Sequence, residues 1–346
     1  MKYVKNKFGE GILYSQEDFN GKVYVLCCAC MSVYSDFLSW ANKYPEKISK
    51  SPEDADEIIV LGCQVTDLSV LNDLRQVEDL YSKYNKSIYI GGCLAQRFDI
   101  ELPLYLKRLD VVREINYPIK NKDYVFYAKP FWVNNFEEND NNLSQGNIFR
   151  NMYPLHIGAG CTFECKYCTI KHMRGDNYEL DAKDQVQEFL DNENVVLISD
   201  SPTEKQIRDW CSIAIKYKKQ ISIRNLEPRV AMNVYNNLLL AAKSGVLKIL
   251  HCPIQSCSSF IINKMSRNVM ATENFINNVK ELRTLGVIVA TNIIIDYEID
   301  GITYSNHDEE VMNELFDYYS WNPYWDGVWN RNKAEERFKK YIDQKE

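Results

Sequence analysis

Three closely spaced cysteines constrain this chain more than any other feature. Cys161, Cys165 and Cys168 have the spacing C-x3-C-x2-C, and the aromatic Tyr167 directly precedes the third cysteine. Three thiolates at this spacing can bind three irons of a [4Fe–4S] cluster and leave the fourth iron without a protein ligand. An iron with an open position is a site for chemistry, so the segment predicts a reactive cluster.

Zinc and disulfides are the competing uses of these cysteines. His172 follows Cys168 by four residues and could complete a four-ligand zinc site, so this segment alone leaves zinc open. A disulfide framework fits less well, because the N-terminus shows no signal peptide and the chain has 11 cysteines, an odd number. So many cysteines in such a chain indicate a reducing compartment, and we expect a cytoplasmic protein.

Length and charge narrow the classes of partner. A chain of 346 residues exceeds the usual single core, so two domains are expected. No apolar run approaches the roughly 18 residues that a membrane span needs, so we expect no membrane partner. The net charge is −7, and the short basic run at Lys216, Lys218 and Lys219 fits a solvated helix end. This balance argues against nucleic acid as the main ligand.

The N-terminal part alternates between strand and helix patterns. Strands are predicted within residues 21–30, 57–61 and 87–90, and helices near residues 37–44 and 69–84. This order predicts an open parallel α/β sheet.

Three further cysteines follow those predicted strands. Cys30, Cys63 and Cys93 each lie just past a strand end, and such ends share one edge of a parallel sheet. The three thiols could therefore converge on one point. The alternative is that they are small buried side chains, which is how we interpret Cys27 and Cys28 within the first strand.

The C-terminal part repeats the alternation. Its candidate strands are residues 153–157, 195–199, 220–224, 246–251 and 287–295, with a weaker one near residues 315–319. Five or six βα units predict a partial, TIM-like (β/α)6 barrel with its site at the carboxyl ends of the strands. Cys161 follows the first of these strands, so its loop is in the expected place.

These patterns predict the domain boundaries. Residues 1–133 form the N-terminal α/β domain, and the polar, turn-rich residues 134–150 form a linker. Residues 151–321 form the partial barrel. Residues 322–346 form a tail with one amphipathic helix, at residues 332–345.

On these motifs the chain resembles the radical S-adenosylmethionine (SAM) methylthiotransferases. The resemblance runs from about residue 21 to about residue 290, through segments at residues 29–36, 55–63, 90–97, 161–175, 225–228 and 251–258. It implies that Cys161, Cys165 and Cys168 hold a [4Fe–4S] cluster whose open iron binds exchangeable SAM. An electron from a flavodoxin-type or ferredoxin-type donor then cleaves SAM to a 5′-deoxyadenosyl radical.

The resemblance also implies a second centre and further contacts. Cys30, Cys63 and Cys93 would bind an auxiliary [4Fe–4S] cluster that carries or delivers sulfur. Tyr167, Glu227 and Gln255 could contact SAM, although core packing explains Tyr167 and a solvated or structural role explains the other two equally well. His251 is more simply a satisfied polar residue near a strand end. No catalytic residue is assigned.

Departures from the family pattern bear on the substrate. Only about 25 residues follow the last barrel strand, where the family has an RNA-binding TRAM module, and residues 293–301 replace a G-F-P-G-E segment. Cys257 replaces a glycine. The expected reaction is methylthiolation at an unactivated C–H carbon of a peptide or small metabolite. The alternatives are a tRNA methylthiotransferase, a two-cluster enzyme forming a thiol or thioether, and a non-catalytic Fe–S or zinc protein.

Overall fold

The structure is a computed structural model that describes residues 1–15, 19, 21–110, 117–128, 148–149, 151–306 and 308–343. Most of the predicted linker, residues 134–150, lies outside the described residues. The chain divides into two compact units, Met1–Glu137 with Trp325–Glu346, and Glu138–Tyr324. The sequence placed residues 322–346 in a separate tail, whereas the structure groups most of that segment with the N-terminal unit.

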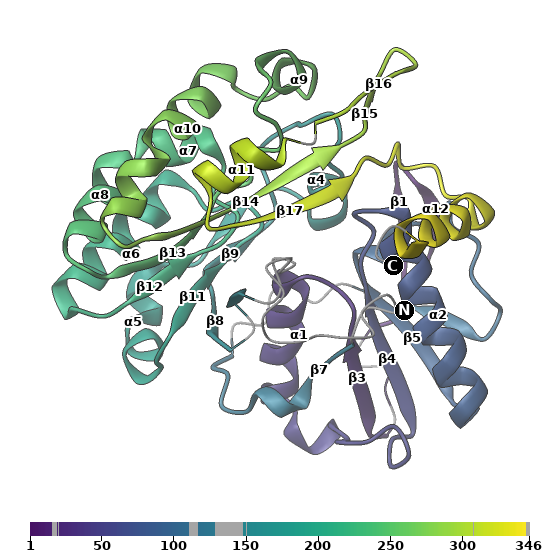
Figure 1. Cartoon of the computed structure of the whole chain (residues 1–346). Coiled ribbons are helices and arrows are strands. Elements are labelled where there is room, and N and C mark those ends of the chain that lie inside the picture. The colour runs from purple at the N-terminus through teal and green to yellow at the C-terminus, as the bar shows by residue number, and fades with distance from the viewer. Residues whose placement is uncertain are drawn as a thin grey trace. The chain divides into compact units, whose positions relative to one another are not determined.

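The first unit is built on a parallel sheet with the strand order β6-β5-β4-β3-β7 (Figure 1). Its strands are β3 (Val23–Cys27), β4 (Glu57–Gly62), β5 (Ser87–Gly92), β6 (Leu106–Arg108) and β7 (Phe126–Tyr127). Every neighbouring pair is parallel. The apolar run in β4 is buried almost throughout, as is usual for a central parallel strand. The predicted open parallel sheet is therefore confirmed.

Helices α1 (Met31–Lys43) and α2 (Asp67–Tyr84) connect these strands. Helix α2 begins where the Thr66 hydroxyl accepts a 3.1 Å hydrogen bond from the Ser69 N–H. It ends at Asn85, which takes the left-handed conformation that stops a helix. Val70, Leu74 and Val77 of α2 pack on the isoleucines of β4 and β5.

The C-terminal helix α12 (Arg331–Asp343) packs on α2 within the same unit. Ala334 and Phe338 contact Leu71, and Arg337 donates to a carboxylate oxygen of Asp67 at 2.6 Å. The remaining elements of this unit are the hairpin of β1 (Lys2–Asn6) and β2 (Gly9–Leu13) and the short 3₁₀ helices Pro45–Lys47, Cys93–Gln96 and Lys122–Tyr124.

The second unit is built on a parallel sheet with the order β17-β14-β13-β12-β11-β8. Its strands are β8 (Tyr153–His156), β11 (Val195–Ile198), β12 (Ile221–Ile223), β13 (Leu247–His251), β14 (Ile288–Ile295) and β17 (Tyr318–Pro323). All five neighbouring pairs are parallel, which confirms the predicted βα-repeat barrel. The weak strand near residues 315–319 begins later than predicted, at Tyr318.

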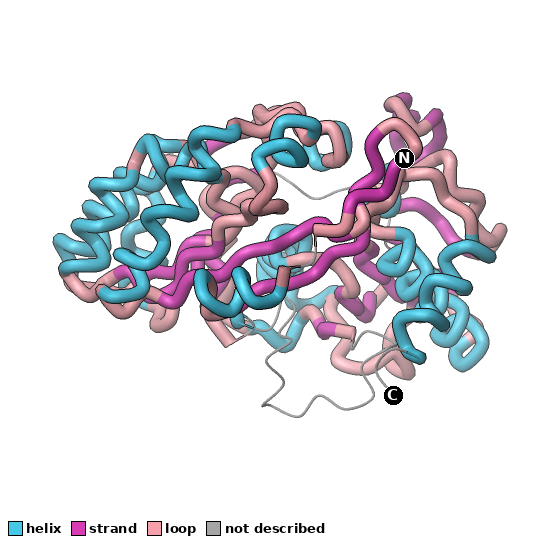
Figure 2. Tube along the Cα trace, turned by 45° about the horizontal axis from the view of Figure 1, so that its top comes forward, coloured by secondary structure: helices cyan, strands magenta, loops and turns pink. Residues whose placement is uncertain are grey.

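Helices follow these strands and cover one face of the sheet (Figures 1 and 2). They are α5 (Ala182–Asp191), α6 (Glu204–Tyr217), α7 (Pro228–Asn233), α8 (Tyr235–Lys243), α9 (Ser259–Lys264), α10 (Val269–Thr284) and α11 (Glu309–Leu315). Trp210 of α6 is fully buried and meets the ring of Phe189 edge to face at 5.4 Å. Short elements complete the unit: β9 (Gly158–Ala159), α4 (Ile170–Arg174), β10 (Tyr178–Glu179), β15 (Tyr297–Ile299) and β16 (Ile302–Tyr304).

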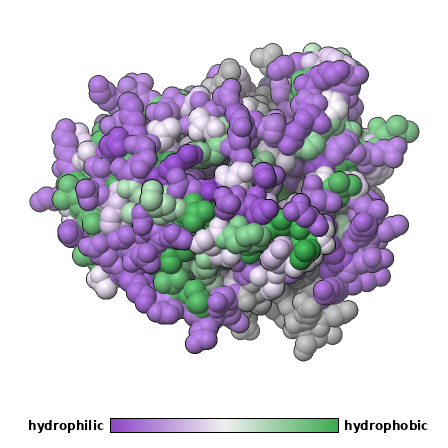
Figure 3. Space-filling model, turned by 90° about the horizontal axis from the view of Figure 1, so that it is seen from above, coloured by the Kyte–Doolittle hydropathy of each residue, from purple (hydrophilic) through white to green (hydrophobic). Residues whose placement is uncertain are grey.

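Hydrophilic side chains dominate the face shown in Figure 3, with hydrophobic ones in patches between them. Across the residues that the structure describes, no helix combines the length and the apolarity needed to cross a bilayer.

Candidate functional site

The cysteine loop runs from Gly160 to Cys168, between β9 and α4, and is held at its base. The Cys161 N–H donates to the Gly175 carbonyl at 3.2 Å, and the Gly160 N–H donates to Asp200 Oδ2 at 2.9 Å. Arg174 Nε donates to the same oxygen at 2.7 Å. The Arg174 and Asp200 side chains are only 1% and 4% exposed. A buried ion pair therefore fixes the start of the loop.

Gly160 is the residue that lets the chain turn into this loop. Its φ is +82°, in the left-handed region that favours glycine. A Cβ at this position would lie 2.2 Å from the carbonyl oxygen of Asp176. Any other residue would have to push this backbone apart.

The three loop thiols are free and interact with one another electrostatically. Burial raises the pKa of Cys161 and Cys165, and it raises the pKa of Cys168 to about 12. The Cys165 and Cys161 charges further raise the pKa of Cys168. Iron binds thiolates, so metal binding here must release protons.

The donor set fits an iron–sulfur cluster. It consists of three free, partly buried thiols on a loop that is held at its base. His172, the alternative zinc ligand, is exposed on α4. As the described side chains stand, no three Cys, His, Asp or Glu groups are arranged to hold a metal ion.

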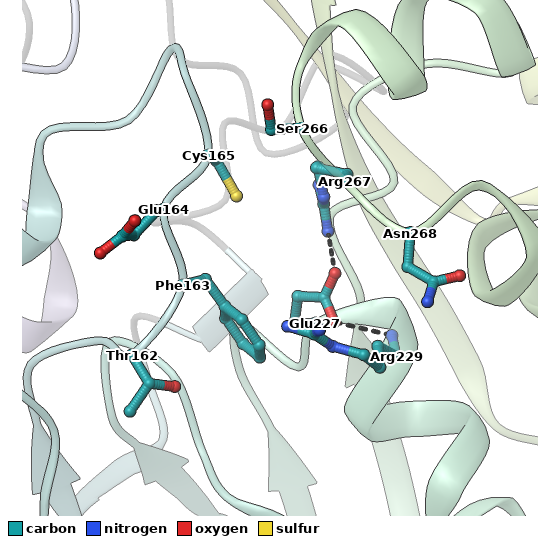
Figure 4. A pocket seen from close by; sticks show the side chains of 9 residues that line it. All are labelled: Thr162, Phe163, Glu164, Cys165, Glu227, Arg229, Ser266, Arg267 and Asn268. Carbon is teal, nitrogen blue, oxygen red and sulfur yellow. Dashed lines mark hydrogen bonds and ion pairs between the residues drawn. The ribbon is translucent and has the colours of Figure 1, made fainter.

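A cavity of about 470 Å³ lies beside the loop. It is lined by Thr162, Phe163, Glu164, Cys165, Glu227, Arg229, Ser266, Arg267 and Asn268 (Figure 4). In Figure 4 the Cys165 sulfur points into the space between the loop and Arg267. On the opposite wall the Arg229 guanidinium lies 4.4 Å from the centre of the Phe163 ring.

Glu227 and Arg267 form the buried polar wall of this cavity. Glu227 begins α7 by accepting a 2.7 Å hydrogen bond from the Arg229 N–H, and its other oxygen pairs with Arg267 Nη2 at 3.2 Å. Arg267 is 3% exposed in its side chain, and its Nη1 donates to the Pro253 carbonyl at 2.7 Å. Its Nε–H is buried and has no hydrogen-bond partner among the described residues.

Of the three predicted SAM contacts, only Glu227 lines this cavity. Tyr167 packs in an apolar cluster with Met265 and Tyr297, and its hydroxyl accepts a 3.4 Å hydrogen bond from Arg267. Gln255 has a φ of +69° and is joined to β14 through its backbone, its N–H donating to the Asn292 carbonyl at 2.8 Å. The roles of all three toward SAM stay predictions.

The other three cysteines lie at one edge of the N-terminal sheet. Cys30 caps α1 after β3, Cys63 follows β4, and Cys93 follows β5. Since β3, β4 and β5 are parallel neighbours, their carboxyl ends lie together, as the strand pattern predicted. Burial raises the pKa of Cys63 well above its usual range, and the charges of Cys30 and Cys93 add to that shift. Each of these two thiols is thus close enough to influence Cys63.

Asp73 is a site residue that sequence reasoning missed. Its carboxylate is fully buried and accepts a 2.5 Å hydrogen bond from the Cys63 N–H. Burial raises the pKa of this carboxyl group well above its usual range. The available signal was an acid in the middle of α2, next to the apolar residues Val70, Leu74 and Val77 that the helix turns toward the sheet. Arg267 was also missed, because nothing in its local sequence sets it apart.

Comparison with known proteins identifies the second unit. Residues 155–309 match the family model of the radical SAM superfamily. This stretch is a radical SAM domain. The domain contains the cysteine loop, Glu227 and Arg267, and it implies SAM and a [4Fe–4S] cluster as cofactors, together with a reductant and a substrate.

The chain also has distant relatives over most of its length. It is 23% identical over 318 residues to the ribosomal protein uS12 methylthiotransferase RimO of Clostridium botulinum (strain Okra / Type B1), covering 79% of this chain and 67% of the relative. RimO of Clostridium acetobutylicum is 22% identical over 330 residues, covering 85% and 70%. Among solved structures, the radical SAM methyltransferase TsrM from Kitasatospora setae has a TM-score of 0.48 at 7% identity, covering 79% and 67%.

Proposed function

We propose that this radical SAM chain inserts sulfur at an unactivated C–H carbon of a peptide or small metabolite, in the manner of a methylthiotransferase. The observation that carries the proposal is the pair of cysteine sets. Each set comprises three cysteines that form no disulfide, and it lies at the carboxyl edge of its own parallel sheet. Two such sets supply ligands for two clusters, each with one iron left for a substrate or sulfur atom.

The loop set is assigned to the cluster that works with SAM. In this role Cys161, Cys165 and Cys168 would hold the cluster, which, when bound and reduced, would supply the electron for cleavage of SAM to a carbon radical. The Arg174–Asp200 ion pair keeps the loop in place. The buried Arg267, whose Nε–H has no described partner, and Glu227 offer a polar wall to the charged end of SAM.

The edge set is assigned to sulfur. Cys30, Cys63 and Cys93 would hold the auxiliary cluster, and the buried Asp73 fixes the Cys63 backbone through its N–H. A nucleophile cannot open a strong C–H bond, whereas a primary carbon radical can abstract the hydrogen. The auxiliary cluster, when bound, would supply the sulfur for the carbon that has lost its hydrogen and accept the one electron that is released as the C–S bond forms.

Two observations support a peptide or small molecule over tRNA. The net charge of −7 means that acidic side chains outnumber basic ones, which disfavours binding to a phosphate backbone. The curated relatives are named as methylthiotransferases of a ribosomal protein. We place the enzyme in the cytoplasm, with a flavodoxin-type or ferredoxin-type protein as its electron donor.

The products of SAM test the reaction type. Anaerobically reconstituted enzyme should form 5′-deoxyadenosine from the radical step and S-adenosylhomocysteine from methyl transfer to sulfur. The triple alanine variant of Cys30, Cys63 and Cys93 should keep the first product and lose the second. If the wild-type enzyme makes 5′-deoxyadenosine alone, the product is a thiol or thioether without the methyl group.

The substrate class needs a separate experiment. Binding of total tRNA at physiological salt should be weak, and deletion of the gene should leave methylthio-adenosine in tRNA unchanged. Mass spectrometry of peptides and metabolites from the same cells should then reveal a species that loses one methylthio group on deletion. Tight tRNA binding, or loss of the modified adenosine, would indicate that the substrate is tRNA.

A further inference from the structure

A chain of polar side chains crosses three neighbouring strands of the radical SAM domain. His251 is the last residue of β13, Asn292 lies in β14, and Ser320 lies in β17. Asn292 and Ser320 are directly paired across the parallel β14–β17 ladder. His251 Nε2 lies 3.1 Å from Asn292 Oδ1, so the three side chains share one face of the sheet. We call His251, Asn292 and Ser320 the barrel relay.

The protonation of His251 is determined by its partners. Its Nδ1 lies 3.1 Å from the backbone nitrogen of Asn225, which can only donate, so Nδ1 must accept. Burial, assisted by the charge of Arg224, lowers the pKa of His251 to about 3. The ring is therefore neutral and carries its one proton on Nε2, from which it donates to Asn292 Oδ1.

This donation orients the Asn292 amide. The Ser320 hydroxyl donates to the same Oδ1 at 3.0 Å, and Asn322 Nδ2 in turn donates to the Ser320 oxygen at 3.1 Å. Both acceptor positions of Asn292 Oδ1 are then filled from within the protein. The two N–H groups of its Nδ2 have no hydrogen-bond partner among the described residues. Asn292 is half-buried, and this nitrogen is not fully enclosed by the protein.

The relay lies where this fold places its ligands. Its residues belong to strands whose carboxyl ends form the functional edge of a βα-repeat barrel. Two nearby residues, Asn225 at +61° and Gln255 at +69°, adopt left-handed φ values that non-glycine residues take at a cost. The Gln255 N–H donates to the Asn292 carbonyl, so the Asn292 backbone is held as well as its side chain.

We propose that the barrel relay presents the Asn292 side-chain N–H groups to an acceptor oxygen, a carboxylate or carbonyl, of the molecule bound inside the barrel. His251 is a positioning residue in this scheme, and Asn292 makes the contact. The place of binding, inside the barrel, rests on the proposed radical SAM function. The oxygen could belong to SAM or to the substrate, and both offer the same acceptor chemistry.

Nuclear magnetic resonance of the reconstituted protein, with its clusters oxidised and with ¹⁵N-labelled histidine and asparagine, tests the relay without turnover. His251 should carry its proton on Nε2 and stay neutral from pH 5 to pH 8. If SAM is the ligand, adding SAM shifts the Asn292 amide signals. If the substrate is the ligand, SAM leaves them in place, and acetate or N-methylacetamide shifts them. The Asn278 amide, which donates to the Asn274 backbone carbonyl on the exposed side of α10, is the internal control and should not move.

Two results contradict the relay. One is a His251 ring protonated on Nδ1, or cationic near neutral pH. The other is an Asn292 signal that SAM, acetate and N-methylacetamide all leave in place. Either result, in a protein that still cleaves SAM, overturns the relay while leaving the proposed function intact. Loss of SAM cleavage from the wild-type protein would instead count against the function.

The conservative Asn292→Asp variant gives an independent readout. It keeps the shape of the side chain but replaces two donors with an acceptor and a charge. His251 should then become cationic at a higher pH than in the wild type, because a carboxylate beside the imidazole favours the charged ring. An unchanged His251 titration would show that the two side chains do not interact, and would contradict the relay.

Discussion

Arg174 and Asp200 form a buried ion pair, 2.7 Å between Nε and Oδ2, at the base of the cysteine loop. The pair joins two segments that are distant in sequence. Arg174 ends α4, which follows the loop, and Asp200 follows β11. Because Asp200 also accepts from the Gly160 N–H, one carboxylate holds both sides of the loop. The placement of the three thiols therefore depends on a charge pair outside the cysteine motif.

Replacing Asp200 by asparagine should loosen the loop. The buried Arg174 would lose the carboxylate with which it pairs, and breaking a buried ion pair typically costs about 3–5 kcal/mol. We expect a lower free energy of unfolding by urea denaturation and less iron retained after anaerobic reconstitution. The control is Asp209→Asn, which breaks the exposed Lys205–Asp209 pair at 3.3 Å and should change neither quantity. If the two variants have equal stability and equal iron content, the Arg174–Asp200 ion pair does not hold the loop.

Gly160→Ala separates a steric clash from left-handed strain. The new Cβ would meet the Asp176 carbonyl oxygen at 2.2 Å and so displace the loop. Gly286→Ala is the matched control, because Gly286 has a similar φ of +83° with open space around it. The control should lose about 1–2 kcal/mol of stability through its strained backbone alone. Iron content should fall only for Gly160→Ala, and a fall in both would point to strain alone.

The sequence predicted those parts that repeat or cluster locally. The strand patterns predicted both parallel sheets, and the C-x3-C-x2-C spacing located the loop. The sequence did not reveal residues whose role depends on partners far away in the chain. Arg267 pairs with Glu227 across 40 residues and touches Tyr167 across 100, so no window along the chain contains that relationship. Asp73 could have been noticed as an acid within the apolar pattern of α2, but the sequence did not show that it binds the Cys63 backbone N–H.

The packing of the C-terminal helix shows the same limit. Its amphipathic pattern predicted a helix at residues 332–345, close to the observed Arg331–Asp343. The pattern carried no information on which surface the helix covers. The structure shows that the helix covers α2, which it contacts through the Arg331–Glu78 ion pair at 2.6 Å and through Phe338 against Leu71.

Glu227 variants test the polar wall of the cavity. Glu227→Ala leaves the Arg267 guanidinium buried without a counter-charge and should destabilise the protein by about 3–5 kcal/mol. Glu227→Gln keeps a hydrogen-bond acceptor for Arg267 and for the Arg229 N–H, so its cost should be smaller. Equilibrium dialysis of SAM against reconstituted protein should show weaker binding for both variants. Unchanged SAM affinity in a folded Glu227→Gln protein would place SAM elsewhere.

His251 should make stability depend on pH. Its pKa is lowered to about 3 in the folded protein, from 6.5. The unfolded chain therefore binds the proton first, and the stabilisation seen above pH 6.5 is lost as the pH falls toward 3. Between pH 7 and pH 5 the loss should be about 2 kcal/mol. Urea unfolding of cluster-free wild type and His251→Asn at both pH values isolates this contribution. An equal pH dependence in the two proteins would contradict a buried neutral ring.

We propose that two separate cysteine sets hold two clusters with different tasks. Iron content and 5′-deoxyadenosine formation should be measured together in wild type and two triple alanine variants. The wild type should hold about eight irons. The Cys161, Cys165 and Cys168 variant should hold about half and make no 5′-deoxyadenosine. The Cys30, Cys63 and Cys93 variant should also hold about half, yet still cleave SAM. Undiminished 5′-deoxyadenosine from the loop variant, or wild-type iron content in the edge variant, would contradict the assignment of the two sets to two clusters.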